Sequence, residues 1–292
     1  MKVTQFRWCW YAWAIVVASA SSLSGNTEKP KSFKLFQDHL PYKVQWGEYI
    51  VSVVSINPES YRFTITSNDG KVQKEIKACF LDSVDFPNLS GKGENDDIRV
   101  VTSPGNNTLS NIRTYCYTRR SALRNILAMP GEFEETRDLN HDGRPEIISD
   151  NPAPLEWVGD LCHGCCPSVT LVLQWRENRY VVANRKFPLL SQQNAEDYKS
   201  RAFSAINHLE ESGSVTHDDI MGPAVGYYAN SALIGEGGTA CQKLKEKMPP
   251  SMYQKFIAIV PDVNKRLSHI PKTITTTNSR IINAPCYLNE PN

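Results

Sequence analysis

After its first two dozen residues the sequence lacks any long apolar run. The single run that it has, Trp8 to Ala18, follows the cations Lys2 and Arg7 and precedes small residues, a pattern typical of an export signal. The run is shorter than the roughly 20 apolar residues that span a bilayer. We therefore expect residues 1–24 to be a signal peptide and the mature protein to be periplasmic or secreted, without stable membrane insertion. The alternative is an uncleaved anchor or a buried N-terminal helix.

The sequence also lacks an excess of charge of either sign, with 32 Lys and Arg against 31 Asp and Glu. Removal of residues 1–24 takes away two cations and no acid, so the mature chain has one more acidic than basic residue. Proteins that bind nucleic acid or anionic lipid through their overall charge are strongly basic. This composition argues against both classes of partner.

Signature motifs of catalysis are absent as well: we find no G-x-S-x-G, no H-E-x-x-H and no phosphate-binding loop. No repeat of 20 to 50 residues is evident. The acids of His217-Asp218-Asp219 suit a helix N-terminus, and the glycines of residues 235–238 suit a turn between helices. An enzyme is therefore less expected than a binding protein. The alternative is an enzyme whose catalytic groups are scattered in the sequence and meet only in the fold.

Cysteine is plentiful by contrast, and its pattern fits an oxidising compartment. Seven of the eight cysteines follow the signal, which predicts up to three disulfides and one thiol. These disulfide candidates are Cys79, Cys116, Cys162, Cys165, Cys166, Cys241 and Cys286. Cys162 and Cys165 form a C-x-x-C pair that favours structural disulfides over a redox dithiol or a zinc site with His163.

Alternating and β-branched residues predict strands over much of the chain. The firmest prediction is a hairpin in which residues 61–66 and 71–79 flank the turn Asn68-Asp69-Gly70. Further strands are predicted at residues 98–102 and 112–118, and a second hairpin at 169–175 and 180–183. Trp157 and Trp175 are expected to pack in the core or on a hairpin.

Helical spacing replaces this pattern after Pro188. Thr216 and Asp219 resemble a helix-start box, and Pro223 with the neighbouring glycines is expected to interrupt the helix after this box. Short helices are predicted at 241–248 and 252–260, on either side of two prolines. The expected fold is α+β.

The chain divides into four predicted parts on this basis. A polar N-terminal tail covers residues 25–40, after the signal at 1–24, and an antiparallel β-rich domain, a sandwich or a meander, covers 41–188. A mainly helical region covers 189–292.

Residues 138–146, DLNHDGRPE, have the composition of a calcium loop. Calcium takes six to eight oxygen ligands, so one short segment must offer an oxygen at every second residue and turn sharply between them. Asp138, Asn140 and Asp142 supply this alternation, Gly143 permits the turn, and a carbonyl at Arg144 and the side chain of Glu146 complete it. The alternative is a metal-free turn in which these side chains cap their own backbone amides.

The pattern D-x-N-x-D-G-x-x-E resembles the short calcium loops of integrin alpha-chain-type repeats and of many secreted bacterial proteins. The resemblance covers nine residues and implies metal ligation at Asp138, Asn140, Asp142, Arg144 and Glu146. A looser resemblance, over roughly residues 133–184, is to periplasmic or secreted bacterial proteins of no established activity. Both resemblances imply a location and a structural ion, and neither implies a reaction.

The sequence is compatible with three hypotheses on function. The first is an exported, non-enzymatic binding module braced by disulfides and a structural calcium ion, whose partner is a protein or an envelope ligand. The second is an extracytoplasmic hydrolase, for which a pocket that brings His163, His217 or His269 to a carboxylate and a nucleophile would be evidence. The third is a periplasmic inhibitor or immunity protein.

Overall fold

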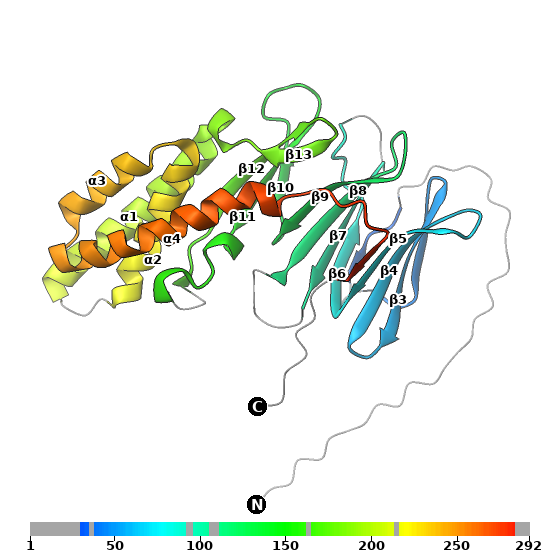
Figure 1. Cartoon of the computed structure of the whole chain (residues 1–292), viewed down its shortest axis with the longest axis horizontal. Helices are drawn as coiled ribbons and strands as arrows, with labels where there is room; N and C mark the ends of the chain where they lie inside the picture. Colours follow the sequence, from blue (N-terminus) through cyan, green and yellow to red (C-terminus); the bar gives the residue numbers. More distant parts are fainter. Residues whose placement is uncertain are drawn as a thin grey trace, which may run out of the picture.

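The computed structural model describes residues 30–34, 38–91, 96–104, 111–161, 165–212 and 216–283. These residues fold into three β-sheets followed by four α-helices, so the predicted α+β class and the order of its parts are confirmed (Figure 1). The predicted signal peptide and half of the predicted N-terminal tail, residues 25–29 and 35–37, lie outside the described residues. No described helix combines the length and the apolar character needed to cross a membrane.

The first two sheets are five-stranded. The first sheet has the order β14-β5-β4-β3-β2, and its strands are β2 (Tyr42–Trp46), β3 (Tyr49–Asn57), β4 (Ser60–Ser67), β5 (Val72–Ala78) and β14 (Ile281–Asn283). The second has the order β1-β6-β7-β8-β9, and its strands are β1 (Phe33–Lys34), β6 (Phe80–Asp85), β7 (Asp97–Ser103), β8 (Arg113–Thr118) and β9 (Arg124–Pro130). All pairs are antiparallel except the pair that β14 makes with β5.

The third sheet has the order β10-β11-β12-β13 and is antiparallel. Its strands are β10 (Glu135–Arg137), β11 (Glu146–Asn151), β12 (Val169–Arg176) and β13 (Arg179–Val182). The helices are α1 (Pro188–Ser212), α2 (His217–Ile234), α3 (Gly237–Lys247) and α4 (Pro250–Thr273). Short 3-10 turns cover Ala153–Leu155, Val158–Asp160 and Asn184–Lys186.

Both predicted hairpins are confirmed. Strands β4 and β5 meet at a turn in which Gly70 has a φ of 84°, and strands β12 and β13 at a turn in which Glu177 and Asn178 have φ of 48° and 70°. Positive φ at both central residues matches the twist of the flanking strands, which is why two-residue hairpins adopt it.

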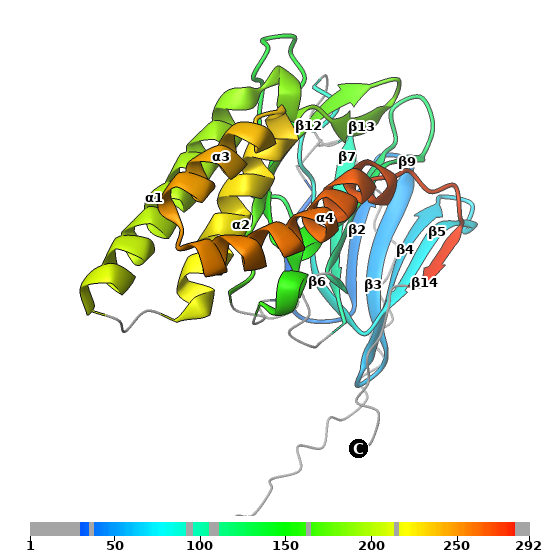
Figure 2. The ribbon, with the colours of Figure 1, turned by 60° about the vertical axis from the view of Figure 1, so that its left-hand side comes forward.

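Two hydrophobic cores share the second sheet. The first core lies between the first two sheets and includes Val53, Phe63 and Tyr117. The second core includes Cys116, the neighbour of Tyr117 in β8, and extends into the third sheet and the helices. Because successive strand residues point to opposite faces, β8 supplies side chains to both cores. The second sheet is therefore a middle layer, with the first sheet on one side and the helical part on the other (Figure 2).

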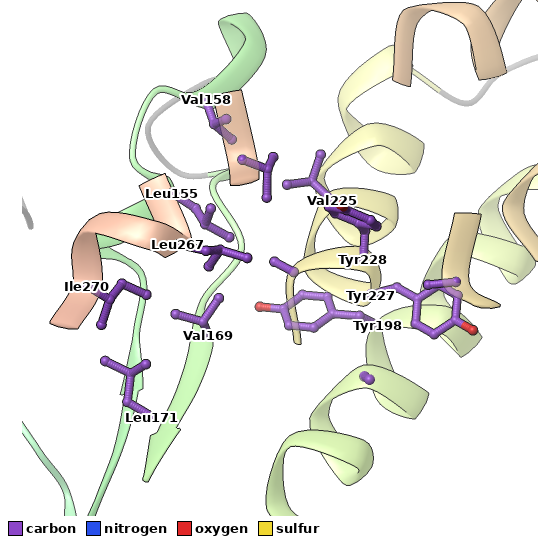
Figure 3. Packing of buried hydrophobic residues seen from close by; sticks show 14 of the residues in the cluster. Leu155, Val158, Val169, Leu171, Tyr198, Val225, Tyr227, Tyr228, Leu267 and Ile270 are labelled. Atoms are coloured by element: carbon purple, nitrogen blue, oxygen red, sulfur yellow. The ribbon is translucent and has the colours of Figure 1, made fainter. Parts of the chain in front are cut away.

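Helix α2 is the centre of the second core, because its residues from Ile220 to Ser231 are all buried. Figure 3 shows Val225 of this helix facing the buried side chains around Leu155 and Val158, whereas the ring of Tyr227 points away from them. The expectation that Pro223 and its glycine neighbours interrupt a helix is wrong. Burial on every side stabilises the helix enough to retain a proline, which costs an interior helix about 3 kcal/mol.

Two glycines of α2 allow neighbouring segments to pack closely against the helix. A Cβ at Gly222 would lie 2.7 Å from the carbonyl oxygen of Cys165, and a Cβ at Gly226 would lie 2.6 Å from the ring of Tyr198.

The predicted helix-start box is present, since the Thr216 side chain accepts from the Asp219 amide and the Asp219 side chain accepts from the Thr216 amide. Gly235 ends the helix with a φ of 94°.

The predicted boundaries at the C-terminal side need two corrections. The paired prolines begin helix α4 instead of merely separating two short helices, because Pro250 occupies its first turn, where a missing N–H costs nothing. Helix α4 then runs past the predicted residue 260 to Thr273. After α4 the chain returns to the first sheet, where β14 pairs in parallel with β5.

Candidate functional site

The aspartate loop, residues 138–146, connects β10 to β11 at one end of the third sheet. Its side chains cap its own backbone. Asp138 accepts from the amides of Asp142 (3.1 Å) and Gly143 (2.9 Å), Asn140 accepts from Asp142 (3.0 Å), and Asp142 accepts from Arg144 (2.9 Å). Positive φ at His141 (58°) and Gly143 (79°) makes this compact path possible. These contacts are those of an Asx-rich turn.

Glu146 closes the loop from its far end. Its side chain is buried, and its two oxygens accept from the Leu139 amide at 2.8 Å and from Gln174 Nε2 at 3.3 Å. Burial raises the pKa of this carboxyl, and the negative charge of Asp142 raises it further. The loop therefore holds the negative charges of Asp142 and Glu146 close together.

Neighbouring segments hold the loop from outside. A Cβ at Gly91, whose φ is 73°, would collide with the carbonyl oxygen of Gly143, so the two backbones are in direct contact. The Tyr180 hydroxyl lies 3.0 Å from the carbonyl oxygen of Pro145 and 2.8 Å from that of Leu89. The loop is consequently a fixed feature of the fold.

The donor set fits calcium, while the observed contacts are those of an Asx-rich turn. The five predicted ligands offer only oxygen, which is what calcium prefers. Within the described ranges, however, no group of three or more His, Cys, Asp or Glu side chains is arranged to hold a metal ion. The side-chain oxygens of Asp138, Asn140 and Asp142 accept instead from backbone amides of the loop.

The side chains of Arg144 and His141 point away from the oxygens of the aspartate loop's predicted ligands or into solvent. His141 is exposed, and the Arg144 guanidinium stacks over the Trp175 ring, with its carbon 5.6 Å from the ring centroid. Trp175 also packs edge-on against Tyr180 at 5.4 Å, which confirms hairpin packing for this tryptophan. Trp157 departs from the expectation, because 57% of its surface is exposed at a residue with a φ of 60°.

The described cysteines include both disulfide-bonded residues and thiols. Cys79 and Cys165 are disulfide-bonded, whereas Cys116, Cys166 and Cys241 are thiols. Cys162, His163 and Cys286 lie outside the described residues. Three thiols leave at most four of the seven cysteines to pair, so the predicted upper limit of three disulfides is not reached. Cys116 illustrates the reason, since it is fully buried in β8, where burial raises the pKa of its thiol.

A bonded Cys165 removes the zinc alternative for the C-x-x-C pair, because a metal site there needs its thiolate. The neighbouring Cys166 is a thiol, and its sulfur accepts a hydrogen bond from the Trp157 amide at 3.1 Å. It lies on a cavity of about 930 Å³ between this segment and helices α1 and α2.

The same cavity contains the histidine that sequence reasoning missed. His208 lines it together with Asp218 and Asp219. The Asp219 carboxylate accepts hydrogen bonds from Thr216 in the helix cap, and these bonds hold the pKa of the carboxyl below its ordinary value. Of the histidines that the sequence suggested, His217 contacts Asp218 at 3.3 Å, and His269 lies exposed on α4. The sequence around His208 gave no signal of a site, because His208 and these acids line one cavity only through the packing of α1 on α2.

Comparison with known proteins found no matching protein family, no similar curated protein and no similar solved structure. The class that the fold defines is an α+β protein with a shared middle sheet, and the aspartate loop is its most distinctive local feature.

Proposed function

We propose that this chain is an exported calcium-binding protein that acts as a non-enzymatic binding module. The calcium ion would be structural, held by Asp138, Asn140, Asp142, the Arg144 carbonyl and Glu146. The export signal at residues 1–24 supplies the periplasmic or secreted location in this proposal.

The observation that carries the proposal is the uncompensated charge of the loop. Asp138, Asp142 and Glu146 form no ion pair with any described residue. Folding nevertheless fixes all three within one closed segment, and the negative charge of Asp142 helps to raise the pKa of Glu146. A divalent cation is the partner that relieves this repulsion and uses the remaining lone pairs of the oxygens.

An extracytoplasmic hydrolase is the second candidate, and the cavity beside His208 favours it. A thiol, a histidine and two carboxylates line one hollow of about 930 Å³. The carboxylates already have partners, Asp219 in the helix cap and Asp218 with His217. The binding module therefore remains the conclusion, and no described feature favours the inhibitor hypothesis.

Melting of the mature protein, with calcium and then with chelator, tests the proposal. An ion that binds only the folded state stabilises it by about 2.7 kcal/mol at a hundredfold excess over its dissociation constant. For a chain of this size we expect chelator to lower the melting temperature by roughly 5 °C and added calcium to restore it. An identical melting curve in both conditions would contradict the proposal.

Asp142→Asn makes the test specific to the loop. The variant removes one charge but keeps an oxygen for the Arg144 amide, so we expect it to lose the calcium response and to melt in chelator as the wild type does. Asp69→Asn is the matched control, since Asp69 is also a turn aspartate that accepts from a backbone amide two residues on. A calcium response that survives Asp142→Asn would place the ion elsewhere.

A further inference from the structure

A second cavity, of about 710 Å³, lies between β13, the turn Asn184–Lys186 and the C-terminal parts of α2 and α4. We call it the basic groove. Four cations line it, namely Arg176, Arg179, Arg185 and Lys186, and its lining includes no Asp or Glu. All four side chains are exposed.

These cations have no acidic partner among the described residues. None of the four forms an ion pair with another residue in the part of the chain that the structure describes. Glu177 lies in the hairpin turn between Arg176 and Arg179, and it too makes no such pair. The net charge of the whole chain is close to zero, so four uncompensated cations in one groove are a local concentration.

The fold holds these charges close together. Arg176 and Arg179 are direct cross-strand partners in β12 and β13, a placement in which like charges destabilise a sheet. Gln174 Oε1 accepts from Arg176 Nε at 3.4 Å and from Lys186 Nζ at 3.0 Å, so one oxygen contacts two cations. An anion bound in the groove would relieve this repulsion.

The opposite wall of the groove is mainly apolar, with Asn264 and Ser268 as its polar residues. Ala232 and Leu233 of α2, Leu267 and Pro271 of α4, and Ile274 contribute to it. A cavity of this volume is within the range of small-molecule sites, which combine an apolar lining with a few polar or charged groups. The two walls together suit a molecule with an anionic head and an apolar body.

We propose that the basic groove binds a small anionic amphiphile of the long-chain carboxylate class. The carboxylate head lies among Arg176, Arg179, Arg185 and Lys186, and the aliphatic body packs on the wall formed by α2 and α4. The proposal gives a ligand class to the binding module proposed above. It does not depend on calcium.

Calorimetric titration of the mature protein in chelator tests the groove separately from the aspartate loop. The ligands are dodecanoate, below the concentration at which it forms micelles, octanoate and acetate. Burial of each methylene strengthens binding roughly three- to fourfold, so we expect dodecanoate to bind at least about tenfold more tightly than octanoate and acetate to bind weakly. Dodecyltrimethylammonium, with the same body and the opposite charge, is expected not to bind.

The charge variant is Arg179→Gln with Arg185→Gln, and its matched control is Lys43→Gln with Arg62→Gln, which removes two exposed cations from the first sheet. Loss of two charge-assisted contacts should weaken dodecanoate binding at least about fivefold, while the control binds as the wild type does. A melting temperature no lower than that of the wild type in the absence of ligand confirms that each variant is folded.

Three results would overturn the proposal: no saturable dodecanoate binding, equal binding of the cationic amphiphile, or equal weakening by the control pair. Binding of a glutamate-rich peptide in the absence of dodecanoate binding would also overturn it, because the groove would then recognise an acidic protein segment. A calcium-insensitive protein that still binds dodecanoate would contradict the proposed calcium site alone.

Discussion

Asp82 shows how one residue's position in the backbone sets its chemistry. It lies at an irregularity of β6, where the register against β7 shifts between Leu81 and Ser83. Burial raises the pKa of this carboxyl to about 6, and the negative charge of Glu132 contributes. The folded state therefore binds the proton more tightly than the unfolded state does, and the cost of the buried charge is present in full only above pH 6.

Asp82→Asn should consequently stabilise the protein in a pH-dependent manner. At pH 8 we expect a gain in the free energy of unfolding on the order of 1–2 kcal/mol, because the variant has no charge to bury. Toward pH 4 the wild-type carboxyl is neutral in the folded state and the gain should shrink toward zero. Urea unfolding of both proteins at the two pH values measures this, and a pH-independent difference would show that Asp82 is not the titrating group.

At the same scale, the aspartate loop shows what local sequence can and cannot predict. The alternation of Asp138, Asn140 and Asp142 identified the loop, because their bonds are made within a few residues of one another. The contacts of Gly91 and Tyr180 with the loop were not predicted, since each residue lies tens of positions away in the sequence. The basic groove was missed for the same reason.

Helix α2 shows the corresponding limit for a whole element. Its start was predicted correctly, because the cap formed by Thr216 and Asp219 is local. Its continuation through Pro223 was not, because burial by the surrounding elements outweighs the propensity of one residue. Asn230 connects this helix to the third sheet, accepting from the Thr170 amide at 2.9 Å and donating to the Ser168 carbonyl at 3.0 Å.

Asn230→Ala is expected to be among the costly substitutions in this element. Asn230 is fully buried, and its loss leaves the buried Thr170 amide without its acceptor, at a cost of about 2–4 kcal/mol in the free energy of unfolding. Gln242→Ala on α3 is the control, since that side chain is exposed and bonds only to Glu246 in its own helix. If urea unfolding gave similar stabilities for the two variants, the connection would have no energetic role.

At the scale of the whole molecule, the second sheet makes the two cores interdependent. β8 directs Tyr117 into one core and Cys116 into the other, so neither core is complete without this strand. β14 adds a further connection, because it follows the helices and pairs with β5 in the first sheet. The α+β order was predictable from hydrophobic periodicity. The return of β14 was not, because its three residues carry too little pattern and their partner lies some two hundred positions earlier.

A single cooperative unfolding transition is the expected consequence of this shared sheet. Val53→Ala opens a cavity in the first core, far from the helices in sequence, at a cost on the order of 2 kcal/mol. We expect it to lower the urea midpoint of the helical circular dichroism signal, which comes from α1 to α4. Arg62→Gln, exposed on neighbouring β4, should leave that midpoint unchanged. An unaltered helical midpoint in Val53→Ala would mean that the two cores unfold independently.

The aspartate loop remains the centre of the account, and the stoichiometry of calcium binding tests it most directly. Calorimetric titration of calcium into the chelator-treated mature protein should give saturable binding of one ion per chain, and Asp142→Asn should abolish it. Absence of binding heat, with no calcium retained after dialysis, would contradict the account and leave residues 138–146 as a metal-free turn.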